Sequence, residues 1–160
     1  HKESLHLEEF DLSELTEMVA EEAQGLAESK AVTLTAEIEP GILVKADQTL
    51  MMRIWLNLLT NAVKYGRQQG QIWLTLKSDG KNAVGTVRDD GIGISAAELP
   101  KIWKRFYRVN TARSSGDDSG TGLGLAMVKW MVESHGGTVS AVSTLGAGST
   151  FSFTIPLRPS

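Results

Sequence analysis

Asn57 and Asn61 stand one turn apart on a predicted helix and are the first residues in this sequence whose spacing suggests chemistry. They occur in N57-L-L-T-N61-A-V-K64-Y65, and at the helical period Arg53 and Lys64 fall on the same face. Amide oxygens suit Mg²⁺, which usually shares its coordination shell with substrate phosphates. Lys64 can reach a phosphate. By itself, the segment is more typical of an ordinary solvated helix face.

Asp89 ends a predicted strand and is followed at once by D-G91-I-G93-I. The glycines would let a flat ligand approach the backbone. An ionised carboxylate only accepts hydrogen bonds, so Asp89 suits the exocyclic amine of adenine and opposes the carbonyl of guanine at that place. The segment therefore predicts ATP in preference to GTP, with a plain Asp-Gly turn as the alternative.

A glycine-rich segment, G120-T-G122-L-G124-L, precedes an amphipathic helix. Its free N–H groups and the positive helix end suit anionic oxygens, although a flexible glycine linker is the alternative. It is not a dinucleotide fingerprint, because a polar loop and not a strand precedes it, and no G-K-[S/T] follows to make a Walker loop. Upstream, Arg108 is the preferred phosphate contact because Phe106 and Tyr107 can anchor it by packing.

Composition and charge exclude several classes of protein. The chain has 160 residues, which fits one domain, 1–160, and its formal net charge of -3 without a basic arm disfavours nucleic-acid binding. It has no cysteine, so disulfides and thiolate metal sites are excluded. The longest apolar runs are too short to span a bilayer. Because no methionine opens the chain, we expect it to be part of a longer protein.

Hydrophobic periodicity and turn residues predict the elements that must position these segments. Helices are expected from Asp11 or Ser13 to 29, from 47 to 65, over 96–106 and over 122–134, with strands at 32–38, 42–44, 71–78, 82–89, 138–143 and 149–155. This order indicates an α+β two-layer sandwich. We expect a mixed, mostly antiparallel sheet of about five strands with about three helices on one face.

Taken together and in this order, the segments resemble the catalytic ATP-binding domain of two-component sensor histidine kinases. The wider superfamily includes DNA gyrase, a heat-shock chaperone and mismatch-repair ATPases. The resemblance extends to L145-G146-A-G148-S149-T150-F151, which is similar to the family's last glycine box. It implies the Bergerat ATP-binding fold, an ATP lid over 95–121, and a remnant over 1–10 of the linker from a dimerisation hairpin.

The same resemblance assigns roles to residues of this sequence. Asn61 would ligate Mg²⁺, and Asn57, Lys64 and Arg108 would act at the phosphates as the catalytic residues. Asp89 would select adenine. The remaining nucleotide-binding positions that the resemblance implies are Tyr65, Gly91, Gly93, Ile94, Tyr107, Gly120, Thr121, Gly122, Leu123 and Gly124. Trp103 takes the place of the first aromatic of the family's phenylalanine box, where we expect it to keep a packing role.

Two departures from the superfamily pattern bear on activity. Its hydrolases carry a glutamate one turn before the magnesium asparagine, whereas this chain has Asn57, and an amide cannot act as a general base. None of the three histidines lies in a context like H-E-x-x-x-P, so the phosphoacceptor is expected on a dimerisation hairpin outside this sequence. A gyrase-like ATPase clamp is therefore disfavoured.

The resemblance then implies a histidine kinase domain that uses ATP and Mg²⁺. Its partners would be the histidine-bearing hairpin and a response regulator. It would form the cytoplasmic part of a membrane-anchored sensor, without nucleic-acid binding or direct membrane contact of its own. Two alternatives stay open: a serine kinase that controls a sigma factor, and a non-catalytic nucleotide-sensing module.

Overall fold

The computed structural model describes residues 5–105, 107 and 124–157. Its elements, in chain order, are β1 (Glu8–Asp11), α1 (Leu12–Ser29), β2 (Thr33–Ile38), β3 (Leu43–Ala46), α2 (Gln48–Tyr65), β4 (Gln71–Ser78), β5 (Asn82–Asp89), the 3₁₀ helix η1 (Leu99–Lys101), α3 (Gly124–Ser134), β6 (Val139–Thr144) and β7 (Gly148–Pro156).

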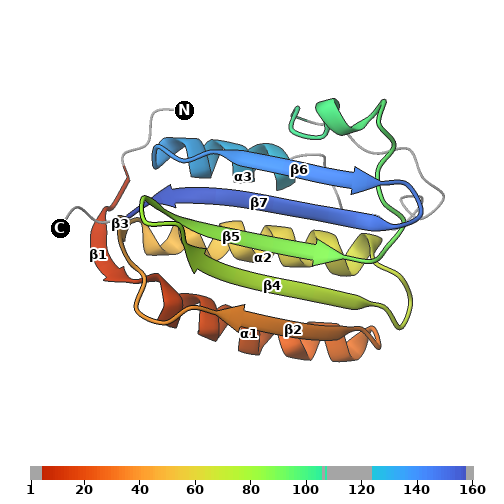
Figure 1. Cartoon of the computed structure of the whole chain (residues 1–160), viewed down its shortest axis with the longest axis horizontal. Coiled ribbons are helices and arrows are strands. Elements are labelled where there is room, and N and C mark those ends of the chain that lie inside the picture. The colour runs from red at the N-terminus through yellow and green to blue at the C-terminus, as the bar shows by residue number, and fades with distance from the viewer. Residues whose placement is uncertain (1–4, 106, 108–123, 158–160) are drawn as a thin grey trace.

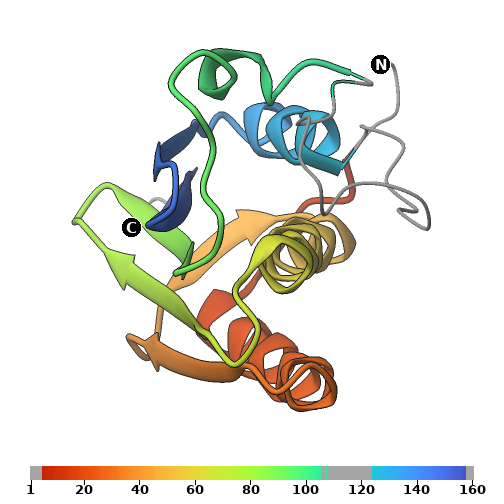
Figure 2. The same ribbon diagram turned by 90° about the vertical axis from the view of Figure 1, so that its right-hand side faces the viewer.

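Five strands form one sheet in the order β2-β4-β5-β7-β6, and β1 pairs with β3 in a small second sheet. β2 runs parallel to β4, and the other neighbours in the large sheet are antiparallel. Figures 1 and 2 show α1, α2 and α3 on the same face of the large sheet. The predicted α+β sandwich, with a mixed sheet and helices on one face, is confirmed.

Asp11, one of the two caps that the sequence offered, and the predicted cap Asp47 begin the long helices. The side chain of Asp11 accepts a hydrogen bond from the Glu14 N–H at 3.0 Å, and that of Asp47 accepts one from the Leu50 N–H at 3.1 Å. Each bond satisfies an N–H that the helix itself leaves without a partner. The caps fix where α1 and α2 begin, and the second of these helices carries the asparagine pair.

The expected helix over 96–106 is wrong: the described residues there form turns and the single 3₁₀ turn η1. Pro100 explains the difference, because it has no backbone N–H to donate and disfavours helical backbone in the residue before it. β1 was not predicted. Only four residues long, with two exposed and two half-buried, it pairs with β3 through contacts distant in sequence.

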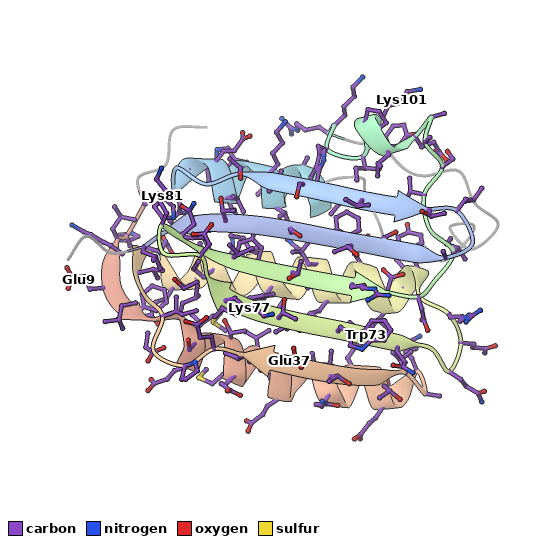
Figure 3. All side chains as sticks on the ribbon, viewed as in Figure 1. Glu9, Glu37, Trp73, Lys77, Lys81 and Lys101 are labelled. Atoms are coloured by element: carbon purple, nitrogen blue, oxygen red, sulfur yellow. The ribbon has the colours of Figure 1, made fainter. Side chains whose placement is uncertain are left out.

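The sheet face turned away from the helices is polar. Figure 3 shows Glu37, Trp73 and Lys77 on this face, and the guanidinium of Arg88 lies 4.7 Å from the Trp73 ring centroid. Neighbouring strands also join through the hydroxyls of Thr75 and Thr86. The cavity described below lies on the opposite, helix-covered side of the sheet.

In the described part of the chain, no helix combines the length and the apolar character needed to cross a membrane.

Gly85 on β5 makes room for the largest aromatic pair of the core. Trp55 and Phe153 pack edge to face with ring centroids 4.9 Å apart, and a Cβ at position 85 would lie 2.5 Å from Phe153 and 2.8 Å from Trp55. We expect Gly85→Ala to lower the free energy of unfolding by about 2 to 3 kcal/mol, because these buried rings cannot move apart freely.

Gly25 is the matched control, because it lies inside α1 with no atom within 4 Å of the position of an added Cβ. Gly25→Ala should raise stability by about 0.5 to 1 kcal/mol, because alanine favours helix. Urea unfolding followed by circular dichroism measures both changes. Equal effects of the two substitutions would contradict the packing argument at Gly85.

Candidate functional site

A small cavity lies where α2, the loop after β5, the start of α3 and β7 meet. The described residues that line it are Asn61, Tyr65, Asp89, Ile92, Gly93, Ile94, Leu125, Ser149 and Phe151. The structure thus brings together the asparagine helix and the Asp-Gly segment. The cavity holds about 30 Å³ as it stands, so a purine ring enters only if the surrounding side chains shift.

Asp89 is the one acidic side chain among the described residues lining this cavity, and it is only 4% exposed. Burial raises its pKa to about 6, although the backbone N–H groups of Gly91 and Ser149 donate to the carboxylate and oppose this rise; the charge of Asp90 adds to it. The Gly91 bond measures 2.8 Å at Oδ1. At pH 7 and above, Asp89 is mostly ionised and accepts hydrogen bonds. A buried carboxylate in a cavity is typical of a functional site.

The loop after Asp89 is held between the end of α2 and the turn that joins β6 to β7. The Ile92 N–H donates to the Tyr65 carbonyl at 3.2 Å, and the Ile92 carbonyl accepts from the Gly146 N–H at 2.7 Å. Gly91 permits the close approach, because a Cβ there would lie 2.2 Å from the Tyr65 oxygen. The Asp-Gly segment therefore forms a fixed wall of the cavity.

Helix α2 is amphipathic as predicted: one of its sides is buried in the core, and the polar stripe lies along another side. Asn61 lines the cavity, and Asn57 lies half-buried one turn earlier. The Lys64 ammonium lies 5.3 Å from the Tyr65 ring centroid. Neither Asn57 nor Lys64 lines the cavity, so the structure places them beside it along the same helix.

Tyr107 and Trp103 flank the site without lining the cavity. The Tyr107 hydroxyl donates to Glu98 Oε1 at 2.7 Å, a bond that raises the pKa of Tyr107. Trp103 packs edge to face on Phe151 with ring centroids 5.9 Å apart, in agreement with the packing role expected for it. Because Phe151 lines the cavity, Trp103 supports the cavity wall from behind.

Several predicted site residues contribute nothing to the cavity wall or fall outside the described part of the chain. Gly91 holds the adjoining loop, and Gly124 begins α3 next to the lining residue Leu125. Outside the described residues lie Arg108, Gly120, Thr121, Gly122 and Leu123.

Four lining residues were missed by the sequence analysis: Ile92, Leu125, Ser149 and Phe151. For two of them a signal existed. Ser149 pairs with Asp89 across β5 and β7, and Phe151, two residues later, returns to the same face. The glycine box that contains them therefore indicated a strand entering the site, although not its register.

His135 has a structural role in the described fold. Its Nε2 accepts a hydrogen bond from the Asp47 N–H at 3.0 Å, so Nδ1 carries the proton and donates to the Met131 carbonyl at 2.7 Å. Both ring nitrogens are occupied, which disfavours His135 as a nucleophile.

Comparison with known proteins agrees with this geometry. The family model described as histidine kinase-, DNA gyrase B- and HSP90-like ATPase matches residues 46–159. The chain is 38% identical over 149 residues to the sensor histidine kinase TmoS of Ectopseudomonas mendocina, covering 92% of this chain and 15% of that protein. It is 35% identical over 146 residues to the sensor histidine kinase YclK of Bacillus subtilis, covering 91% of this chain and 31% of that protein.

Solved structures show the same fold. The mycobacterial sensor histidine kinase MprB superposes with a TM-score of 0.83 at 28% identity, covering 96% of this chain and 100% of that one. Full-length ShkA in complex with AMPPNP gives a TM-score of 0.85 at 28% identity, covering all of this chain and 33% of that one. By the match over 46–159, the chain belongs to the family of histidine kinase-, DNA gyrase B- and HSP90-like ATPases.

Proposed function

We propose that this chain binds Mg²⁺-ATP with the adenine in the cavity around Asp89. The observation that carries the proposal is the buried carboxylate of Asp89, held by N–H donors of Gly91 and Ser149 and facing a largely apolar cavity. An acceptor in this position suits the adenine 6-amino group. Support also comes from the ShkA structure, which was solved in complex with AMPPNP.

Asn61 would hold the magnesium ion, and Asn57, Lys64 and Arg108 would act at the phosphates. The donor set fits, because Asn61 offers a neutral amide oxygen at the cavity wall and Asn57 offers another one turn away. Magnesium would neutralise charge on the phosphate oxygens when bound. The chain's own residues supply position and positive charge, which is the main catalytic need in phosphoryl transfer.

The reaction that we propose is transfer of the γ-phosphate to a histidine on a dimerisation hairpin of the parent protein. An imidazole nitrogen forms the new P–N bond while the bond to the β-phosphate oxygen breaks, and ADP leaves. Asn57 favours transfer over hydrolysis, because an amide cannot take a proton from water. The sensor kinases TmoS and YclK support this assignment by their similarity.

From that histidine, the phosphate would pass to an aspartate of a response regulator. The chain spans 15% and 31% of the length of TmoS and YclK, so the remaining functions would reside elsewhere in a longer protein. We propose that this protein is a membrane-anchored sensor whose ATP-binding domain lies in the cytoplasm.

Phosphate labelling of the purified chain tests the transfer step. With radioactive ATP, the chain alone should bind nucleotide and incorporate no label, and adding the hairpin of its parent protein should restore labelling that is labile in acid. Label on His135 in the isolated chain would contradict the proposal. Acid-stable label on a partner would favour a serine kinase instead.

Asn61→Ala should abolish the magnesium dependence of ATP binding. We expect the affinity of the wild-type chain for ATP to fall at least about tenfold when EDTA removes the metal, and the variant to bind equally with or without it. Calorimetry with both proteins, with and without Mg²⁺, measures the difference. Thr60→Ala changes an exposed neighbour on the same helix and should keep the wild-type dependence. An undiminished magnesium effect in Asn61→Ala would exclude Asn61 as the ligand.

A further inference from the structure

We propose that Ser143 on β6 is a positioning residue that holds the hydroxyl of Ser149 as a second acceptor for the adenine 6-amino group. The inference rests on the proposed function, because it requires that ATP occupy the cavity. Ser143 is opposite Ser149 in the pairing of β6 with β7, and Ser149 lines the cavity while Ser143 does not.

Among the described residues, the hydroxyl of Ser143 has three neighbours within hydrogen-bond distance. It accepts from the Ile94 N–H at 2.7 Å, it donates to the Gly148 carbonyl at 3.0 Å, and it lies 2.8 Å from the Ser149 hydroxyl oxygen. A serine hydroxyl has a single proton and the Gly148 carbonyl can only accept, so we assign the Ser143 proton to the Gly148 carbonyl. The third bond then requires Ser149 to donate to Ser143.

This assignment fixes what Ser149 presents to the cavity. With its own proton directed at Ser143, the Ser149 hydroxyl keeps only lone pairs for other partners. The backbone N–H of Ser149 donates to the Asp89 carboxylate, so the Ser149 hydroxyl and the Asp89 carboxylate are held close together. Ser149 and Asp89 are both acceptors, and both are at least nine-tenths buried.

Two neighbouring acceptors discriminate between purines by the group at the 6-position of the ring. An amino group carries two hydrogens, one for each acceptor, whereas a 6-oxo group would turn its lone pairs towards both. Buried acceptors that face another acceptor make no hydrogen bond and repel it, which costs binding free energy. The pair should therefore favour adenine over hypoxanthine, which differs from it at this position and in protonation of the neighbouring ring nitrogen.

A purely structural role for Ser143 would have a different signature. Its bond to the Ile94 N–H also holds the loop that forms one cavity wall, so loss of the hydroxyl could loosen the site for any nucleotide. Such loosening would weaken the binding of ATP and of inosine triphosphate (ITP) equally. Only loss of the Ser149 orientation would change their ratio.

The experiment measures calorimetric affinities for Mg²⁺-ATP and Mg²⁺-ITP with the wild-type chain, Ser143→Ala, Ser143→Thr and Ser149→Ala. We expect Ser143→Ala and Ser149→Ala to lower the ATP-over-ITP preference by about tenfold each. Ser143→Thr retains the hydroxyl and should keep the wild-type preference. Ser140→Ala, on the exposed face of the same strand, is the matched control and should keep it too.

The outcomes separate this inference from the proposed function. If the wild type binds ATP but Ser143→Ala keeps the wild-type ratio, or weakens both nucleotides equally, the positioning role is overturned and the proposed function stands. If the wild type binds neither nucleotide, the proposed function falls and this inference with it. The inference is supported if Ser143→Ala lowers the ATP-over-ITP preference and Ser143→Thr keeps it. This holds even if thermal melts show that Ser143→Ala loses some stability.

Discussion

Asp89→Asn is expected to lower the affinity for ATP by about a hundredfold or more while making the domain more stable. The binding loss arises because the Asn amide must keep its oxygen for the Gly91 N–H group, which turns its NH₂ towards the adenine amine. Two donors then face each other in a buried site. Calorimetry with Mg²⁺-ATP measures the loss.

The stability gain follows from the raised pKa of Asp89. Because burial raises it to about 6 in the folded chain, the folded state holds its proton more tightly than the unfolded state, so stability falls as pH rises from 3.8 to about 6 and the full cost remains above that. The rise bounds the gain at about 3 kcal/mol, and we expect about 1 to 2 kcal/mol at pH 8 because Asn offers one acceptor oxygen in place of two.

The difference in stability should depend on pH with a defined sign. Asp89→Asn should exceed the wild type most at pH 8, and the gap should close as pH falls through about 6 and vanish below the ordinary value of 3.8, where both states are protonated. Urea unfolding at several pH values tests this. A constant gap from pH 8 to pH 4 would show that Asp89 titrates normally.

Asp90→Asn supplies the control for the binding loss. Asp90 is the next residue and also carries a carboxylate, but its Oδ1 accepts from the Gln71 N–H at 2.9 Å and it does not line the cavity. Asp90→Asn should bind ATP about as well as the wild type. Equal losses in both variants would indicate a general electrostatic effect and would argue against adenine recognition by Asp89.

Local signals in the sequence were enough to predict most of the fold. Caps at Asp11 and Asp47 and the period of the apolar residues predicted α1 and α2, and alternation with a turn predicted β4 and β5. β1 lacked such a signal, because its four residues are stabilised by pairing with a distant strand. The helix over 96–106 was wrong because Pro100 disfavours a regular α-helix through this segment.

The candidate site could be predicted only where one segment carried its chemistry. Asn61 and Asp89 each had a recognisable neighbourhood, so their convergence on a cavity could be expected. Ser149 could not, because its place beside Asp89 depends on the register between β5 and β7, strands separated by many residues. The role of Ser143 could not be predicted either, because Ser143 lies in no motif and its hydroxyl acts through contacts with Ser149 and Ile94.

Gly93→Ala should cost about 3 to 5 kcal/mol of stability and remove ATP binding. Gly93 has a φ of +73°, and a Cβ there would lie 2.2 Å from the Thr144 carbonyl oxygen and 2.8 Å from its carbon. Neither atom can move alone, because the turn after Thr144 is bonded to Ile92 through the Gly146 N–H. The loop of Asp89 must therefore move away from β6, which displaces the adenine acceptor.

Gly146→Ala separates backbone strain from this crowding. Gly146 has a φ of +83°, close to that of Gly93, but no atom lies within 4 Å of the position of an added Cβ. Its substitution should cost about 1 to 2 kcal/mol from the left-handed backbone alone and leave most ATP binding intact. Urea unfolding and calorimetry on both variants test the pair. If they lose the same stability, the backbone conformation alone requires glycine at position 93; a larger loss in Gly93→Ala, together with lost binding, means that contact with β6 holds the Asp89 loop in its binding position.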